Sequence, residues 1–266
     1  MMVEGNSFAS FYDFYDAPEY RKAQLAFYLG LARETGDPIL ELASGTGIIT
    51  LELAREGFTV TGIDVSPDML FVAREKLARE KPAIQQRIEY VEGDMADFDL
   101  GKEFRAILIP TNSFGYLTTM DAQKRCLATA YRHLSSGGTI VIEERLYTPD
   151  VLVKMQARRA VPTIQTARVN PASGKYTTFH WITTHIDLTR QIIHSTRFVE
   201  EVEPDGTVRR IVPEGGGKTS IHFFNTFELQ LLLEQAGFEI VHIWGGHDQQ
   251  PIASTSNSMI FVARKT

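Results

Sequence analysis

The sequence predicts an α/β fold whose open sheet is interrupted, late in the chain, by an antiparallel β insertion. Residues 38–50 have the pattern of a buried strand, a glycine turn and the start of a helix. Residues 58–64 have the pattern of a second strand, and it ends in an acidic residue. Residues 175–224, in contrast, hold long β-prone runs joined by turn signals, with no helix between them.

The predicted elements follow from this patterning, taken in chain order. Helices are expected over residues 23–32, 67–81, 121–134 and 227–235, where apolar residues recur at helical spacing. Core strands are expected at 39–42, 58–64, 88–92, 104–109, 139–143, 239–244 and 258–263. The runs 175–185, 192–202, 208–212 and 219–224 should form the antiparallel insertion.

The first strand and its turn suggest a ligand site. Asp37-Pro38 breaks the chain before the strand, and Gly45 and Gly47 permit positive φ and a bare backbone. A turn that leads from a strand into a helix presents unpaired backbone N–H groups. The turn therefore suits a nucleotide-like ligand.

Three ligand classes compete for this turn, beside an ordinary βα turn without a ligand. A P-loop needs a Lys that the turn lacks, and in a dinucleotide fingerprint the third glycine position falls on Thr50. Glu41, within the strand, would repel a pyrophosphate but pair with an ammonium group. S-adenosylmethionine, which carries an amino acid and no phosphate, suits the arrangement.

Two further acids follow the next two strands. Asp64 lies 23 residues after Glu41, close to the roughly 20-residue spacing of a carboxylate that binds a ribose diol. Ser66 is a better cap for the following helix, so we expect Asp64 to be free at the end of its strand. Asp94 can accept a hydrogen bond from an adenine amino group, and Met95 can cover the ring.

With these residues in place, the chain resembles the class I S-adenosylmethionine-dependent methyltransferases. Residues 41–47 match the first motif of that family, with Ala43 in place of its first glycine. Asp64 and Asp94 match the acids that follow strands two and three of the family. Residues 109–114 match the motif after strand four, and residues 134–139 match the turn before strand five. The resemblance implies a Rossmann-like sheet of seven strands whose final strand is antiparallel.

The resemblance also implies site residues. The expected donor-binding residues are Tyr12, Tyr20, Glu41, Ala43, Ser44, Gly45, Thr46, Gly47, Asp64, Val65, Met69, Asp94, Met95, Ala96, Ile109 and Thr111. The expected acceptor-binding residues are Tyr15, Asn112, Phe114 and Tyr116. His247 is a candidate general base, because its ordinary pKa is near physiological pH, although a structural or solvated role is the alternative.

Three regions are expected. Residues 1–37 form an amino-terminal helical lid, whose Tyr12-Asp13-Phe14-Tyr15 resembles a segment that closes over the donor, or else a helix packed on the sheet. Residues 38–146 and 225–266 form the donor-binding core. Residues 147–224 form the antiparallel insertion, which covers the substrate, pairs two subunits as a homodimer, or only extends the sheet.

Bulk properties exclude several classes. The net charge of −6 argues against a general nucleic-acid binder. A single cysteine excludes an intrachain disulfide framework, and the spacing of His180, His185, His194 and His222 fits no standard zinc motif. No apolar run predicts a membrane span, and no signal peptide is evident, so the cytoplasm is the expected compartment.

The predicted function is methyl transfer from S-adenosylmethionine to a nitrogen or oxygen of a small-molecule acceptor. One alternative is a nicotinamide-dependent oxidoreductase, against which Glu41 and Thr50 argue. The other is a protein that binds S-adenosylmethionine without catalysis.

Overall fold

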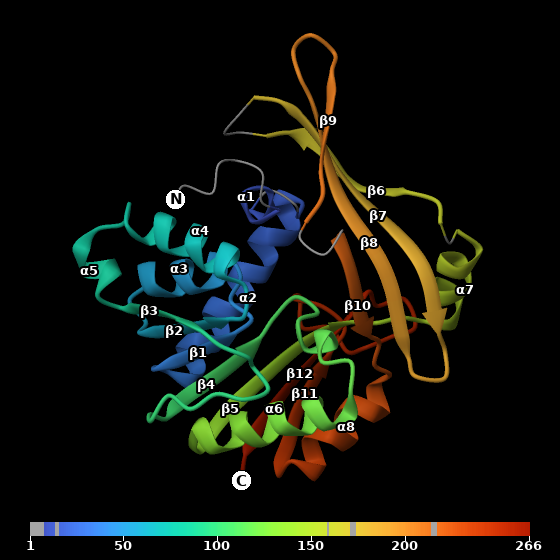
Figure 1. Ribbon diagram of the computed structural model, residues 1–266. Coiled ribbons are helices and arrows are strands. Elements are labelled where there is room, and N and C mark those ends of the chain that lie inside the picture. Colours follow the sequence, from blue (N-terminus) through green and yellow to red (C-terminus); the bar gives the residue numbers. More distant parts are fainter. Residues whose placement is uncertain (1–7, 14–15, 159, 171–173, 214–216) are drawn as a thin grey trace. The chain divides into compact units, whose positions relative to one another are not determined.

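A computed structural model describes residues 8–13, 16–158, 160–170, 174–213 and 217–266. The chain divides into two compact units, which we treat separately (Figure 1). The core unit comprises Lys22–Tyr147 and Phe223–Thr266, and the insertion unit comprises Met1–Arg21 and Thr148–His222. In the described part of the chain, no helix is long and apolar enough to cross a membrane.

The core unit is built on a seven-stranded sheet in the order β11-β12-β5-β4-β1-β2-β3. Its strands are β1 (Ile39–Leu42), β2 (Val60–Asp64), β3 (Ile88–Glu92), β4 (Phe104–Ile109), β5 (Leu134–Arg145), β11 (Phe238–Trp244) and β12 (Ser258–Lys265). Neighbours from β5 to β3 pair in parallel, whereas β12 pairs antiparallel with both β5 and β11. The predicted Rossmann-like sheet with an antiparallel last strand is confirmed.

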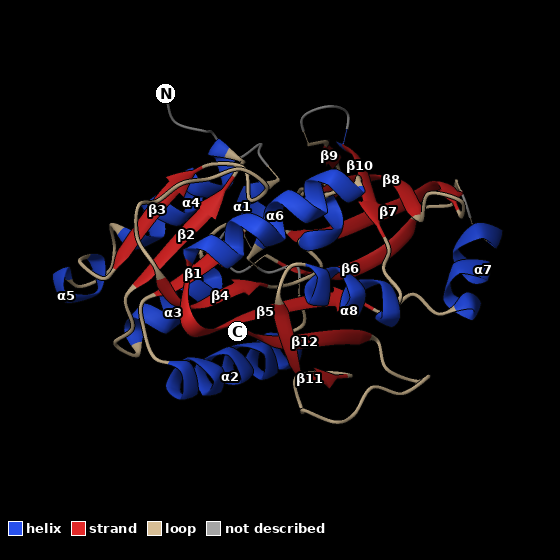
Figure 2. Ribbon diagram, turned by 90° about the horizontal axis from the view of Figure 1, so that it is seen from below, coloured by secondary structure: helices blue, strands red, loops and turns tan. Residues whose placement is uncertain are grey.

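Helices cover both faces of this sheet. They are α2 (Pro18–Thr35), which begins in the insertion unit, α3 (Ile48–Arg55), α4 (Pro67–Leu77), α5 (Pro82–Gln85), α6 (Met120–His133) and α8 (Thr226–Gln235), with the short 3-10 helix η1 (Phe114–Tyr116). Figure 2 shows α2 and α6 on opposite sides of β1 and β4.

Alternation along β1 explains the two layers. Ile39 packs in a cluster that contains Leu31 of α2 and Leu53 of α3, whereas Leu40 packs in a second cluster with Leu127 of α6. Successive side chains of a strand point to opposite faces, so a strand covered on both faces is apolar throughout. All four residues of β1 are buried, Glu41 included.

Strand β5 is longer than predicted. It begins at Leu134 rather than at residue 139, and its pairing with β4 jumps from Phe104–Leu134 to Ala106–Thr139. The expected turn before strand five is therefore present as an irregularity within the strand, where Gly137 has a φ of 70°. At its other end β5 continues past the predicted end at residue 143 to Arg145, and its last three residues include two acids, Glu143 and Glu144.

The insertion unit confirms the predicted antiparallel insertion between the fifth and sixth core strands. It consists of α1 (Ala9–Tyr12), α7 (Pro149–Ala157), β6 (Thr163–Val169), β7 (Tyr176–Asp187), β8 (Ile192–Val202), β9 (Val208–Ile211) and β10 (Lys218–His222). The order is β10-β8-β7-β6, with β9 also paired to β8, and every pairing is antiparallel. Helix α7 and strand β6 were not predicted.

A small apolar cluster ties the described amino-terminal residues to this sheet. Phe11 of α1 packs with Phe179, Val199 and Ile211, and Phe8 lies edge-on to Phe179. Phe8 and Phe11 therefore pack on the insertion sheet.

Candidate functional site

The glycine turn connects β1 to α3. Ala43, Gly45 and Gly47 all have positive φ, at 55°, 55° and 74°. A Cβ on Gly47 would lie 2.0 Å from the hydroxyl oxygen of Tyr90, so this position accepts only glycine. Ala43 adopts the same left-handed region with a methyl group, which is a strained state for an L-residue. The turn thus keeps the conformation of the motif despite the substitution.

Glu41 lies beneath the turn and is shielded from solvent. Its side chain accepts a hydrogen bond from the Thr50 hydroxyl of α3. Burial raises the pKa of Glu41 to about 8, against the opposing effect of the Thr50 hydrogen bond. A cation bound next to this carboxyl group would favour its ionised form.

Asp64 lies at the carboxyl end of β2, beside the turn. One carboxylate oxygen accepts from the backbone N–H of Gly45 at 2.7 Å, and the other from that of Ser66 at 2.8 Å. The expectation that Asp64 is free is therefore wrong, because neighbouring backbone N–H groups orient both oxygens. Burial raises its pKa. The predicted cap is confirmed, since the Ser66 hydroxyl accepts from Met69 N–H and Pro67 begins the helix.

The third acid follows β3. Asp94 is exposed and accepts from the backbone N–H of Ala96 at 2.8 Å, while Met95 and Ala96 are buried. Register places these residues together, because β1, β2 and β3 are parallel neighbours with Leu42 opposite Ile63 and Asp64 opposite Glu92. Of the other predicted donor-binding residues here, Val65 is exposed and Met69 half-buried.

The loop after β4 adjoins the same edge. Thr111 and Asn112 both have positive φ, at 57° and 60°. Ile109 is buried, and Phe114 is buried and stacked on Phe224 with ring centroids 5.3 Å apart, so both belong to the core. Tyr116 is 44% exposed.

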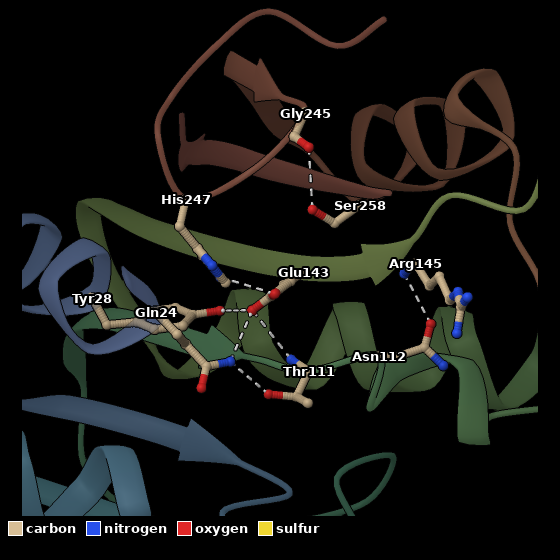
Figure 3. A network of polar contacts seen from close by, with 9 residues as sticks. All are labelled: Gln24, Tyr28, Thr111, Asn112, Glu143, Arg145, Gly245, His247 and Ser258. Carbon is tan, nitrogen blue, oxygen red and sulfur yellow. Dashed lines mark hydrogen bonds and ion pairs between the residues drawn. The ribbon is translucent and has the colours of Figure 1, made fainter. Parts of the chain in front are cut away.

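Glu143, near the end of β5, is the centre of a polar network that the sequence analysis missed (Figure 3). One carboxylate oxygen accepts from the Tyr28 hydroxyl at 2.8 Å, the Thr111 N–H at 3.3 Å and the Gln24 amide at 3.5 Å. The other lies 2.9 Å from Nε2 of His247. The sequence signal was an acid at the end of a buried strand, at the edge where α/β sheets bind ligands.

Glu144 is buried as well, and it points to the opposite face of the strand. Its carboxyl group accepts from the backbone N–H of Gly115 at 3.0 Å. Burial, with a smaller contribution from Glu143, raises its pKa well above the usual value. Both acids of β5 are therefore hydrogen-bonded to the loop that follows β4.

The remaining predicted residues lie elsewhere. Tyr12 and Tyr20 belong to the insertion unit, Tyr12 edge-on to Phe8 and Tyr20 39% exposed. Tyr15 lies outside the described residues. Across the residues that are described, no group of three or more His, Cys, Asp or Glu side chains is arranged to hold a metal ion.

Comparison with known proteins agrees with this geometry. The family model described as a methyltransferase domain matches residues 39–138. A Geobacillus sp. (strain WCH70) protein named as a methyltransferase is 24% identical over 236 residues, which cover 88% of this chain and 86% of that protein.

Two other relatives have more specific names. A dTDP-3-amino-3,4,6-trideoxy-α-D-glucopyranose N,N-dimethyltransferase of Streptomyces venezuelae is 34% identical over 105 residues, or 40% of this chain and 41% of that protein. A solved structure of CalS10 with bound S-adenosylmethionine, an amino pentose methyltransferase from Micromonospora echinaspora, has a TM-score of 0.69 at 20% identity. The match covers 97% of this chain and 96% of the CalS10 chain, and the likeness supports the fold.

Proposed function

The chain is a class I S-adenosylmethionine-dependent methyltransferase, and we propose that it methylates a nitrogen or oxygen atom of a small-molecule acceptor. The observation that carries the proposal is the sheet edge where the glycine turn, Asp64 and Asp94 adjoin the strained loop after β4. The name of the Streptomyces venezuelae relative, which acts on an amino sugar, favours nitrogen.

The residues of this edge fit S-adenosylmethionine. We propose that the backbone of residues 43–47 and the carboxyl group of Glu41 hold the methionine end. The Ser44 hydroxyl is buried and has no hydrogen-bond partner among the described residues, so it can serve a bound polar group. Asp64 retains further lone pairs for the ribose hydroxyls, and Asp94 can accept from the adenine amino group beside Met95.

The protein's part in the chemistry is positioning. The bound cofactor supplies a methyl group on a positively charged sulfur, which is already electrophilic. The chain must hold a nucleophile in line with that methyl group at short range and exclude water. A neutral amine can attack through its lone pair, whereas a hydroxyl needs a base. Asn112 and the exposed Tyr116 are the acceptor-facing residues that we propose from the loop after β4.

For the insertion unit we propose a role as substrate cover, as a dimer surface, or both. A homodimer through its sheet would be detected by light scattering of the intact chain. Val202 and Val208 are exposed on this sheet, and their substitution by Ser should dissociate such a dimer. If the variant kept the mass of the dimer, that result would count against a sheet-mediated dimer.

Transfer of a labelled methyl group tests the proposed acceptor class. The purified chain is incubated with methyl-labelled S-adenosylmethionine and matched pairs of acceptors, such as an amino sugar and the corresponding neutral sugar. We expect label on one class of small molecule, and its loss in Asp64→Ala. Donor binding without transfer to any amine, hydroxyl or thiol would overturn the proposed acceptor and favour a non-catalytic donor-binding role.

A further inference from the structure

We infer that Glu143 and His247 form a positioning device that fixes the loop after β4, and that His247 does not act as a general base. The inference rests on the proposed function for its relevance to methyl transfer. Its evidence is the network of Figure 3, which lies entirely within the core unit.

The loop is in a conformation that needs support. Thr111 and Asn112 are consecutive residues with side chains, and both have left-handed φ values. Such residues persist only where the surrounding structure restrains them, and they cluster at functional sites. Thr111 is β-branched, which makes a left-handed φ still less favourable.

Strand β5 supplies the restraint through four hydrogen bonds. Glu143 accepts from the Asn112 N–H through its carbonyl at 2.9 Å and from the Thr111 N–H through its carboxylate at 3.3 Å. The Asn112 side-chain oxygen accepts from the Arg145 N–H at 2.9 Å, and Glu144 accepts from the Gly115 N–H at 3.0 Å. Three successive residues of one strand therefore hold the loop.

The Glu143 carboxylate is itself held by other elements. It is 3% exposed, and a buried carboxylate is costly unless donors surround it. Helix α2 provides the Tyr28 hydroxyl and the amide of Gln24, which also donates to the Thr111 hydroxyl at 2.9 Å. His247, in the connection between β11 and β12, provides the contact on the other oxygen.

The surroundings of His247 oppose a catalytic role. Its side chain is 6% exposed, and its ring lies against Phe27 and Tyr28, with centroids 5.5 and 6.4 Å away. Nε2 lies 2.9 Å from a carboxylate oxygen of Glu143, so this nitrogen is directed at that carboxylate. A general base must reach the acceptor proton, and this nitrogen faces Glu143.

The test compares His247→Leu with His247→Gln, which keeps a donor near the Nε2 position. The readouts are amide hydrogen exchange at residues 111 and 112 and the dissociation constant of S-adenosylmethionine. For His247→Leu we expect exchange and dissociation constant to rise roughly tenfold or more. For His247→Gln we expect both to stay within about threefold of the unmodified protein, because the donor restores the contact.

Leu233→Ala is the matched control for general destabilisation, because Leu233 is fully buried in α8 and is not part of the network. It should lower the midpoint of urea unfolding. Amide exchange at residues 111 and 112 should stay close to that of the unmodified protein, in contrast to His247→Leu. Equal acceleration in Leu233→Ala, or unchanged exchange and donor affinity in His247→Leu, would overturn the inference.

Once an acceptor is known, activity separates the two roles of His247. A positioning role predicts that His247→Gln keeps most of kcat with a pH profile of unchanged shape. A general base predicts that Gln and Leu are equally inactive while donor affinity and exchange are normal, and this result would also overturn the inference. Exchange and donor binding need no acceptor, so failure to find one would count against the proposed function alone.

Discussion

Glu41→Gln is the substitution whose effect follows most directly from the structure. Glu41 is 2% exposed, and its carboxyl group has a pKa of about 8, raised from 4.5 by burial. At about 1.4 kcal/mol per pH unit, this difference corresponds to roughly 5 kcal/mol in favour of the protonated form in the folded protein. Water that penetrates to the carboxyl group weakens this preference. We therefore expect the protonation of Glu41 to change the free energy of unfolding by about 2–5 kcal/mol.

The direction of the change of stability with pH follows from the number of protons that the folded and unfolded chains bind. Between pH 4.5 and 8 the folded chain holds a proton at Glu41 that the unfolded chain has released, so stability falls as pH rises. The stabilisation is fully present below pH 4.5 and is lost as pH rises through 8. Glutamine is neutral and can still accept from Thr50, so Glu41→Gln should lack this decline.

Urea unfolding at pH 5, 6.5 and 8.5 without donor measures the difference. We expect Glu41→Gln to gain about 2–4 kcal/mol over the unmodified protein between pH 5 and 8.5. Glu239→Gln, which neutralises an exposed carboxylate on β11, is the control and should parallel the unmodified protein. Parallel pH profiles for Glu41→Gln and the unmodified protein would refute the reasoning.

Three further predictions concern the same unit. Gly47→Ala should abolish measurable S-adenosylmethionine binding in calorimetry, because the added carbon would lie 2.0 Å from the Tyr90 hydroxyl oxygen. The control Gly57→Ala, at a glycine that also has positive φ but has open space around it, should keep binding. Equal binding by the two variants would contradict this prediction. Ala43→Gly should raise the free energy of unfolding by about 0.5–1 kcal/mol, because glycine relieves the left-handed strain, and a loss of stability in urea unfolding would count against it. Cys126 is fully buried and burial raises the pKa of its thiol, so a thiol reagent should label it only as the protein unfolds; rapid labelling of the folded protein would disagree.

The sequence was sufficient for the features that depend on local patterning. Buried strands, the turn around Gly45 and Gly47, and the acids at strand ends are all encoded within short windows, and so is the Ser66 cap. Strand β6 was missed because residues 163–169 carry no strong alternation, and they form a strand by pairing with the edge of β7.

The polar network could not be derived in the same way. Glu143 contacts Tyr28, which is 115 residues away in sequence, and Thr111, which is 32 residues away. Only the folded sheet brings them together, so nothing in a short window indicates the partners. His247 was noticed for its chemistry, but its contact with Glu143 became apparent only from tertiary structure. The freedom expected for Asp64 failed because the Gly45 N–H points at it.

Calorimetric titration with S-adenosylmethionine, and separately with NADH, tests the central claim of a donor site at the carboxyl edge of β1, β2 and β3. We predict one S-adenosylmethionine site per chain, no binding of NADH, and a dissociation constant at least tenfold higher in Asp64→Ala. Unchanged donor affinity in Asp64→Ala, or binding of NADH in place of the donor, would contradict the account.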